Sequence, residues 1–267
     1  MQMNKTNIEK LIMLVRANKK ALPYVNIDSN GNYAGWVSDF HIVDKQTGKS
    51  VCLNLACPQD RFILFAIASC WSRSGAWENG AYFGAYLKSL HEDPFTYWMD
   101  KNKIAEEKEK SSKVAEQIEQ NGGLKPRKKV AFRSDFYDSL EVLAKNWESI
   151  EKSLKNSERQ NDYMIFIDCI SSMKGLGAGK RTMKIKIPLI LRELRIQNIY
   201  ENIPGKWCCV PDSRVIKAAK SDIFAIDLPN YCTTIPAVLK ASERIYNLFT
   251  DLYDLPLFAF KDIEDLF

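Results

Sequence analysis

Residues 163–195 read YMIFIDCISSMKGLGAGKRTMKIKIPLILRELR, two apolar stretches joined by a glycine-rich turn. The turn follows the pattern h-x-x-h-x-G-h-G, where h is apolar, with Ile170, Met173, Gly175, Leu176 and Gly177. Apolar residues at this spacing pack two short helices together, and the glycines let the chain reverse tightly between them. Backbone N–H groups at the start of the second helix can then bind a DNA phosphate. The stretch predicts a helix-hairpin-helix whose second helix begins at Lys180.

A second interpretation of this turn is a P-loop, in which backbone N–H groups and a lysine surround the phosphates of a nucleotide. It requires residues 164–170, MIFIDCI, to form a strand. Gly175 and Gly179 are one residue too close for G-x-x-x-x-G-K-[ST], and Arg181 stands where the magnesium-binding Ser or Thr belongs. The helix-hairpin-helix is the better match, and a nucleotide-binding enzyme stays an alternative.

The positive charge of the chain is unevenly distributed. The whole chain has 38 Lys and Arg, 33 Asp and Glu and a formal net charge of +5, yet residues 171–220 alone hold eleven basic and three acidic residues. A basic excess confined to one stretch is typical of a surface that binds a polyanion such as nucleic acid. Lys-rich solvated helices are the alternative explanation. The predicted DNA-binding residues are Gly175, Gly177, Gly179, Arg181, Lys184 and Arg214. Lys186 is expected to supply further positive charge near the turn.

The rest of the chain is mostly helical in pattern. Apolar positions recur at helical spacing in residues 4–19, in 59–90, in 135–154 and from 213 onward. Residues 22–56 instead alternate and contain two turn signals, which predicts two or three short antiparallel strands. We therefore expect a mainly α protein with a small antiparallel β element near the N-terminus.

The same patterns predict how the chain is organised. Residues 1–58 would form an N-terminal helix and the small β segment, and residues 59–267 a helical region. Within that region, residues 101–129 are strongly charged and poor in large apolar groups, which is typical of a solvated insertion. Its basic end, KPRKK, can also contact DNA.

The composition excludes several classes of protein. No apolar run approaches the roughly 18 residues of a membrane span, and residues 1–10 lack the apolar core of a secretory signal. Seven cysteines without regular spacing argue against a disulfide framework or a zinc knuckle, and two histidines argue against a His-rich metal site. We expect a cytoplasmic protein with reduced thiols, no metal and no cofactor.

Asp212 lies in the sequence Pro211-Asp-Ser-Arg-Val215, thirty-two residues after Lys180. The sequence is typical of a helix N-cap, in which the carboxylate accepts hydrogen bonds from free N–H groups of the following helix. A purely structural cap is the simplest interpretation of an isolated aspartate before a helix. A catalytic role for Asp212 is the alternative.

A helix-hairpin-helix, a lysine at its second helix and a D-x-R-V aspartate that opens a later helix together resemble the helix-hairpin-helix DNA glycosylase superfamily. The interval between Lys180 and Asp212 is similar to that of its archaeal 8-oxoguanine glycosylase branch. Trp77-Glu, followed by AYFGAY at residues 81–86, is similar to a W-E-Y-F-G-x-Y-F stretch of that branch. Residues 256–267 loosely resemble its C-terminal segment.

The resemblance covers residues 60–100 and 160–267 and implies a two-lobed helical glycosylase fold. In the superfamily the lysine attacks the sugar and the aspartate assists, which assigns these roles to Lys180 and Asp212. Trp77 and Asp262 match residues that contact the extruded base, and Trp207 can supply a further aromatic face. No cysteine quartet follows the hairpin, so no iron–sulfur cluster is implied.

The sequence departs from the family pattern close to the nucleophile. One extra residue separates Gly177 from Lys180, and Pro188 interrupts the second helix. Lys184 lies one turn further along and stays a rival for the nucleophile.

The expected function is DNA repair by base excision. A flipped base would enter an aromatic pocket, and a lysine kept neutral by neighbouring Arg181 and Lys184 would form a Schiff base with the sugar. β-Elimination would then nick the strand. We expect a monomeric, nucleoid-associated DNA glycosylase and AP lyase that excises an oxidised purine, 8-oxoguanine, from double-stranded DNA. The alternative is a non-catalytic helix-hairpin-helix DNA-binding protein.

Overall fold

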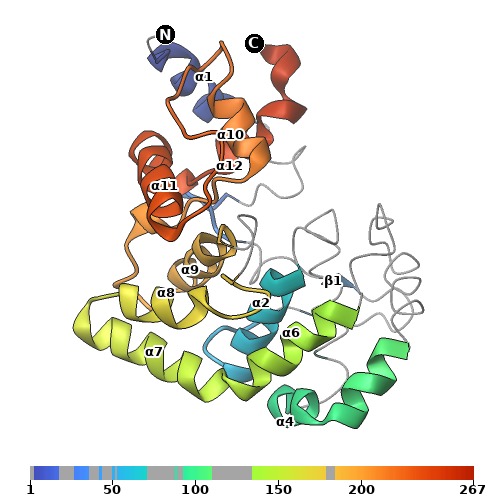
Figure 1. The fold of residues 1–267 in the computed structure, drawn as a ribbon. Coiled ribbons are helices and arrows are strands. Elements are labelled where there is room, and N and C mark those ends of the chain that lie inside the picture. The colour runs from blue at the N-terminus through green and yellow to red at the C-terminus, as the bar shows by residue number, and fades with distance from the viewer. Residues whose placement is uncertain are drawn as a thin grey trace. The chain divides into compact units, whose positions relative to one another are not determined.

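The computed structural model describes residues 3–17, 27–35, 42–43, 50–51, 53–70, 88, 93–109, 134–178 and 184–267. These residues are mainly helical (Figure 1), which confirms the predicted fold class at this level. Within these ranges, no helix combines the length and the apolar character needed to span a membrane.

Contacts divide the chain into two compact units. Unit 1 comprises residues 1–39 and 180–267, and unit 2 comprises residues 40–179. Unit 1 therefore contains both ends of the chain. The predicted segments 1–58 and 59–267 stay a prediction.

Unit 2 is built mainly from helices. Its described elements are β1 (Ile42–Val43), β2 (Ser50–Val51), α2 (Pro58–Cys70), α4 (Pro94–Met99), α6 (Ser134–Lys145), α7 (Trp147–Gln160) and α8 (Met164–Ser171), and residues 101–109 are also helical. α7 and α8 lie side by side (Figure 1). Asn161 ends α7 in the left-handed conformation, with φ of 52°, which reverses the chain. The Ser157 hydroxyl then accepts the N–H of Phe166 at 3.0 Å and ties the two helices together.

Edge-to-face aromatic contacts form the core of unit 2. The ring of Trp147 meets those of Phe62 and Phe65 with centroids 5.3 Å apart, and it stacks on Phe95. Aromatic pairs in these arrangements stabilise a core beyond the area that they bury. α2 supplies two of the rings, which explains why its sequence is apolar on nearly every face.

The sequence MIFIDCI is helical, because it lies within α8. A short apolar run suits a buried strand and a buried helix equally, and periodicity alone does not distinguish them. Here Phe166, Ile167 and Ile170 are buried along one face of the helix. A P-loop requires a strand before its glycines, so the P-loop interpretation is wrong.

The predicted β element is described only at a few positions. β1 and β2 pair antiparallel, with Ile42 opposite Val51 and Val43 opposite Ser50. An isolated antiparallel bridge joins Ile27 to Tyr33. Most of the remaining residues between 22 and 52 lie outside the described residues, so a small sheet over residues 22–56 stays a prediction.

Unit 1 is built from short helices around a compact core. Its described elements are α1 (Lys5–Ala17), α9 (Lys186–Ile196), η2 (Gly205–Trp207), α10 (Ser213–Ala219), α11 (Ile235–Phe249), η3 (Thr250–Leu252), α12 (Leu255–Ala259), η4 (Phe260–Asp262) and η5 (Glu264–Leu266). α12 packs against both α10 and α1. The rings of Phe224, Phe260 and Phe267 meet edge to face beside them. This packing brings the C-terminal segment next to the helix that follows Asp212.

The helix after the glycine-rich turn begins later than predicted. α9 begins at Lys186, and Lys184 and Ile185 form a turn before it, so Lys180 does not begin this helix. Pro188 consequently lies in the first turn of α9 rather than interrupting it. Proline is tolerated there because the first N–H groups of a helix have no partner within the helix. α8 and α9 belong to different units, and the helix-hairpin-helix over residues 163–195 stays a prediction.

Two glycines of the turn are required by close packing in unit 2. Gly175 has φ of +86°, and a Cβ there would lie 2.8 Å from the side chain of Ser139. A Cβ at Gly177 would lie 2.4 Å from the Cα of Ser171, far inside van der Waals contact. The turn can therefore close against the end of α8 only with glycine at position 177.

Gly177→Ala is expected to lower the free energy of unfolding by about 2 kcal/mol or more, because a new Cβ pressed on backbone forces the chain to move. Urea unfolding of the purified protein measures this. Ser172→Ala, a change at an exposed side chain of the same turn, is the control and should stay within about 0.5 kcal/mol of wild type. Equal stability of the Gly177 variant and the control would contradict the packing role.

Candidate functional site

Asp212 is the N-cap of α10. Its Oδ1 accepts the N–H of Val215 at 2.8 Å, and its backbone is extended, with φ of −74° and ψ of 177°. Both features are those of an N-cap. The structural half of the prediction for Asp212 is thus confirmed, and its catalytic role stays a prediction.

The carboxyl group of Asp212 is also electrostatically unusual. Burial raises its pKa from 3.8 to about 6, although the hydrogen bond from Val215 acts to lower it. The negative charge of Asp254 raises the pKa further, and the charge of Arg214 lowers it. A carboxylate held in a poorly solvated place is a stronger base than an ordinary aspartate, and such groups are frequent in active sites.

Arg214 and Asp262 form an ion pair beside Asp212. Arg214 Nη2 lies 2.5 Å from Asp262 Oδ2, and the guanidinium lies 4.2 Å from the ring centroid of Phe258. Both charged side chains remain partly exposed, at 31% and 41%. Three of the predicted site residues therefore lie together in one cluster where α10 meets α12 and η4.

Beneath this cluster lies a buried ion pair. Arg192 Nη1 donates to Asp254 Oδ1 at 2.7 Å, and both side chains are buried. Burial is the largest single effect and acts to lower the pKa of the Arg192 guanidinium, but the interactions with Asp254, Tyr33, Glu193 and Cys209 together outweigh it, so the pKa lies above its ordinary value. Asp254 Oδ1 also accepts the N–H of Val210, two residues before Asp212.

Trp207 and Asp262 are both predicted to bind the extruded base, but they lie in different parts of unit 1. Trp207 ends η2, which packs against α11 and α9, and its side chain is half-buried. Asp262 belongs instead to the cluster of α10 and α12. The structure gives no support to a shared base-binding site for these two residues.

The lysines near the turn differ in exposure. Lys184 is half-buried, whereas Lys186 is fully buried at the start of α9. We expected Lys186 to contribute surface charge near the turn, and this is wrong because a side chain with no exposed surface cannot contact a DNA phosphate. Lysine is almost never fully buried unless it is paired.

The glycine-rich turn uses its own carbonyl groups as hydrogen-bond acceptors. The N–H groups of Leu176, Gly177 and Ala178 are all directed at the carbonyl oxygen of Met173, at 3.0–3.2 Å. These three N–H groups are therefore engaged within the turn and are not directed at a phosphate. Four predicted site residues, Trp77, Gly179, Lys180 and Arg181, lie outside the described residues.

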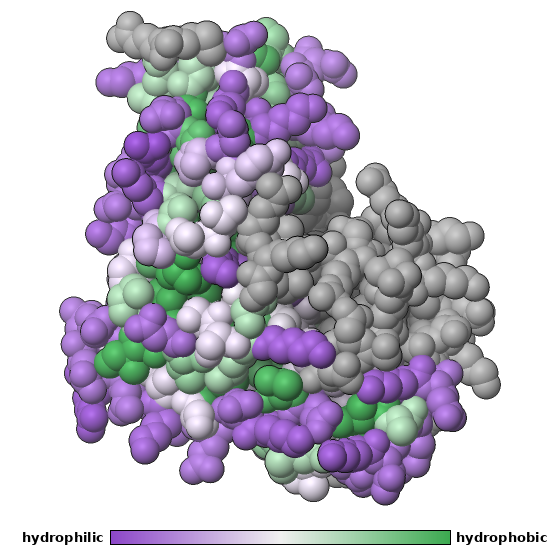
Figure 2. Space-filling model, viewed as in Figure 1, coloured by the Kyte–Doolittle hydropathy of each residue, from purple (hydrophilic) through white to green (hydrophobic). Residues whose placement is uncertain are grey.

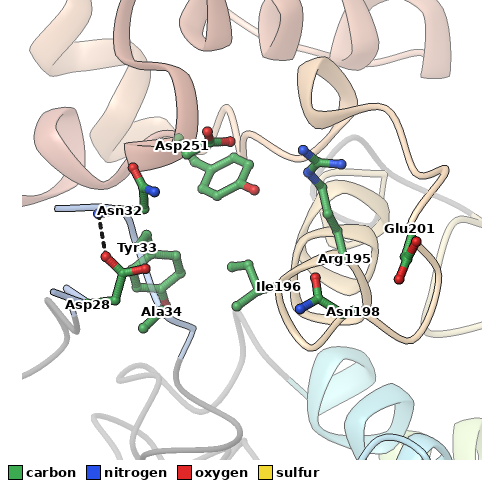
Figure 3. Close-up of a pocket in the computed structure, with 10 residues that line it drawn as sticks. Asp28, Asn32, Tyr33, Ala34, Arg195, Ile196, Asn198, Glu201 and Asp251 are labelled. Atoms are coloured by element: carbon green, nitrogen blue, oxygen red, sulfur yellow. Dashed lines mark hydrogen bonds between the residues drawn. The ribbon is translucent and has the colours of Figure 1, made fainter. Parts of the chain in front are cut away.

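A cavity of about 550 Å³ opens elsewhere in unit 1 (Figure 3). Its lining includes three carboxylates, from Asp28, Glu201 and Asp251, and the single guanidinium of Arg195. Figure 3 shows Asp28 bonded to the backbone of Asn32, where its Oδ1 accepts the N–H at 2.9 Å. An excess of carboxylates repels a phosphate backbone, so this cavity is unsuited to hold DNA.

The visible surface offers no broad apolar patch on the described residues. On the face drawn in Figure 2, hydrophilic residues predominate and apolar ones show only in separate patches. The exposed large apolar side chains of the described ranges, Met13, Met99, Tyr231 and Leu266, come from separate segments. Among the described residues, no group of His, Cys, Asp and Glu is arranged to hold a metal ion.

Sequence reasoning missed the roles of Asp254 and Arg192. Asp254 precedes Leu255-Pro256, which is a helix-start signal, and the sequence could have placed it before a helix. It could not have shown that the carboxylate binds a guanidinium 62 residues away.

Comparisons with protein-family models, with curated proteins and with solved structures found no match.

Proposed function

We propose that the protein is a DNA glycosylase with AP lyase activity that removes an oxidised purine, 8-oxoguanine, from double-stranded DNA. Lys180 is the nucleophile and Asp212 the acid–base partner. The enzyme works as a monomer near the nucleoid. Its fold is a two-lobed helical glycosylase fold with a helix-hairpin-helix over residues 163–195.

The observation that carries the proposal is the state of Asp212. Its carboxyl group is fixed by the Val215 N–H at the start of α10, and its pKa is raised to about 6. A general base works best when its pKa lies near the operating pH. At pH 7 this group is ionised, yet it binds a proton far more readily than an ordinary aspartate does.

Three further features support the proposal. The basic excess of residues 171–220 surrounds both Lys180 and Asp212 in the sequence, and it suits a negatively charged DNA backbone. Unit 1 and unit 2 are both mainly helical, which is what a glycosylase fold of two helical lobes requires. Arg214 and Asp262 are partly exposed next to Asp212, so they are available to exchange their mutual ion pair for contacts with DNA.

The chemistry assigns one task to each residue. Asp212 accepts a proton from the attacking lysine and stabilises the positive charge that develops on the sugar as the base leaves. The neutral amine of Lys180 forms a bond to C1′ of the sugar, and the base departs with the bonding electron pair. The C1′–O4′ bond then breaks as the nitrogen lone pair forms the C1′=N double bond of the Schiff base, and the ring oxygen stays on C4′ and takes up a proton. Removal of a C2′ proton then expels the 3′ phosphate from C3′.

A non-catalytic DNA-binding protein is the second candidate. The observation that favours it is that Asp212 Oδ1 already has a structural task as the N-cap of α10. Such a protein would bind duplex DNA through the basic stretch and cleave nothing.

Incubation with a duplex that carries one 8-oxoguanine, in EDTA, tests the proposal and its pH dependence. We expect strand nicking at the lesion, and a single-turnover rate that falls about tenfold per pH unit below about pH 6, because the Asp212 carboxylate is then protonated. An undamaged duplex is the control. Binding of both duplexes without nicking at any pH would favour the second candidate.

A further inference from the structure

The segment that leads to Asp212 has no regular secondary structure and is buried. Cys208, Cys209, Val210 and Pro211 are all buried residues. Two of their N–H groups bind side chains: Cys209 donates to Ser242 Oγ and Val210 to Asp254 Oδ1, each at 2.8 Å. Because a buried N–H group needs a partner, these two acceptors fix the path of the chain into α10.

The two acceptors differ in kind. Ser242 is neutral, whereas Asp254 carries a charge that is held in place by Arg192, whose Nη1 lies 2.7 Å from the same Oδ1. Arg192 Nε also lies 3.5 Å from Glu193 Oε1. Removing two charges from water is unfavourable, and a buried ion pair is therefore weak evidence for a purely stabilising role. A neutral side chain would suffice to accept one N–H group.

We propose that Asp254 is a positioning residue for Asp212: fixed by Arg192, it holds the Val210 backbone and places a negative charge near the Asp212 carboxyl group. This inference rests on the proposed function, because it assigns Asp254 a part in tuning the acid–base group. Asp254 itself contacts neither DNA nor the reacting atoms.

The charges that act on Asp212 come from both helices of the cluster. Asp254, before α12, raises the pKa of Asp212, and Arg214, in α10, lowers it. Asp262, in η4, forms an ion pair with Arg214, the cation whose charge lowers the pKa of Asp212. Burial has the largest effect of all, so removal of Asp254 should lower the pKa of Asp212 only part of the way toward 3.8.

Asp254→Asn is the sharpest test. Asp254 Oδ1 accepts both hydrogen bonds, from Val210 and from Arg192, so the amide oxygen of asparagine can keep both while the charge is lost. The Asp212 carboxyl group is titrated by NMR in the full-length protein, and the pH profile of nicking is recorded in parallel. We expect the pKa of Asp212 to fall below about 6 and the acid limb of the profile to move with it.

Asp251→Asn is the matched control, because it removes a carboxylate three residues away in η3 that binds Tyr246 rather than the Asp212 segment. It should leave the titration of Asp212 in place. If the buried guanidinium prevents Asp254→Asn from folding, the double variant Arg192→Gln/Asp254→Asn supplies a neutral hydrogen-bonded pair, and the same fall is expected.

An Asp212 titration that is unchanged in the folded Asp254 variant, or that falls equally in the Asp251 control, would overturn the inference. This result does not depend on nicking activity, because the titration of Asp212 is measured without substrate. A wild-type protein that never nicks lesion DNA would instead overturn the proposed function.

Discussion

Asp212→Asn is expected to lower the single-turnover rate of base excision by about 10²–10⁴-fold and yet to make the protein more stable at pH 8. Asparagine is as good an N-cap as aspartate, so its amide oxygen can still accept the Val215 N–H and hold the start of α10. The change removes only the charge and the ability to take up a proton.

The gain in stability follows from the raised pKa of Asp212. The folded protein holds this proton up to about pH 6, whereas the unfolded chain releases it near pH 3.8. The free energy of unfolding therefore falls as the pH rises through this window, and the loss is complete above it. Asparagine never ionises, so the variant should match wild type below about pH 4 and exceed it at pH 8.

We expect the gain at pH 8 to be about 1–2 kcal/mol. A rise in the pKa of Asp212 from 3.8 to about 6 corresponds in full to about 3 kcal/mol of stability. We expect less, because Asp212 is only half-buried and a helix N-terminus favours a carboxylate. Urea unfolding at pH 4 and pH 8 measures the difference.

Asp93→Asn is the matched control for this experiment. Asp93 is the N-cap of α4 in unit 2, where it accepts the N–H groups of Phe95 and Thr96. The same chemical change at this cap should leave nicking unaltered. An Asp212→Asn protein as active as wild type would reduce Asp212 to a cap and favour the non-catalytic candidate.

Lys180→Ala is expected to abolish nicking of a duplex that contains an abasic site, because no Schiff base can form without the nucleophilic amine. Lys184→Ala is the matched comparison. It removes a second lysine of the same stretch and should retain nicking, with weaker binding of DNA through the loss of one positive charge. Quantitative gel analysis of both variants at low salt measures the two effects separately.

The reverse pattern would assign the chemistry to the other lysine. Loss of nicking in Lys184→Ala with retention in Lys180→Ala would make Lys184 the nucleophile. Retention in both variants would contradict a lysine of this stretch as nucleophile.

Local signals predicted much of the helical fold. Apolar spacing located α1 within residues 4–19 and predicted α2 to within one residue of its start, since α2 begins at Pro58 and the predicted helical range at residue 59. The Pro-Asp-Ser sequence located the N-cap at Asp212. These features depend on residues a few positions apart, which is the range over which periodicity and capping act.

Features that depend on distant residues were not predictable. The apolar run MIFIDCI suits a strand as well as a helix, and only the glycine spacing that follows it favoured the helix that the structure shows. Lys186 looks like a surface charge in a basic stretch, yet it is fully buried. The raised pKa of Asp212 depends on burial and on Asp254, which only the fold brings near.

Borohydride trapping on lesion DNA is the most direct test of catalysis by Lys180. Wild-type protein is incubated in EDTA with a duplex that carries one 8-oxoguanine, the Schiff base is reduced, and the modified lysine is identified by mass spectrometry of the digested adduct. We expect a covalent adduct on Lys180 that forms with the lesion duplex and not with undamaged DNA. The absence of any adduct, on either the lesion duplex or one with an abasic site, would contradict catalysis by Lys180.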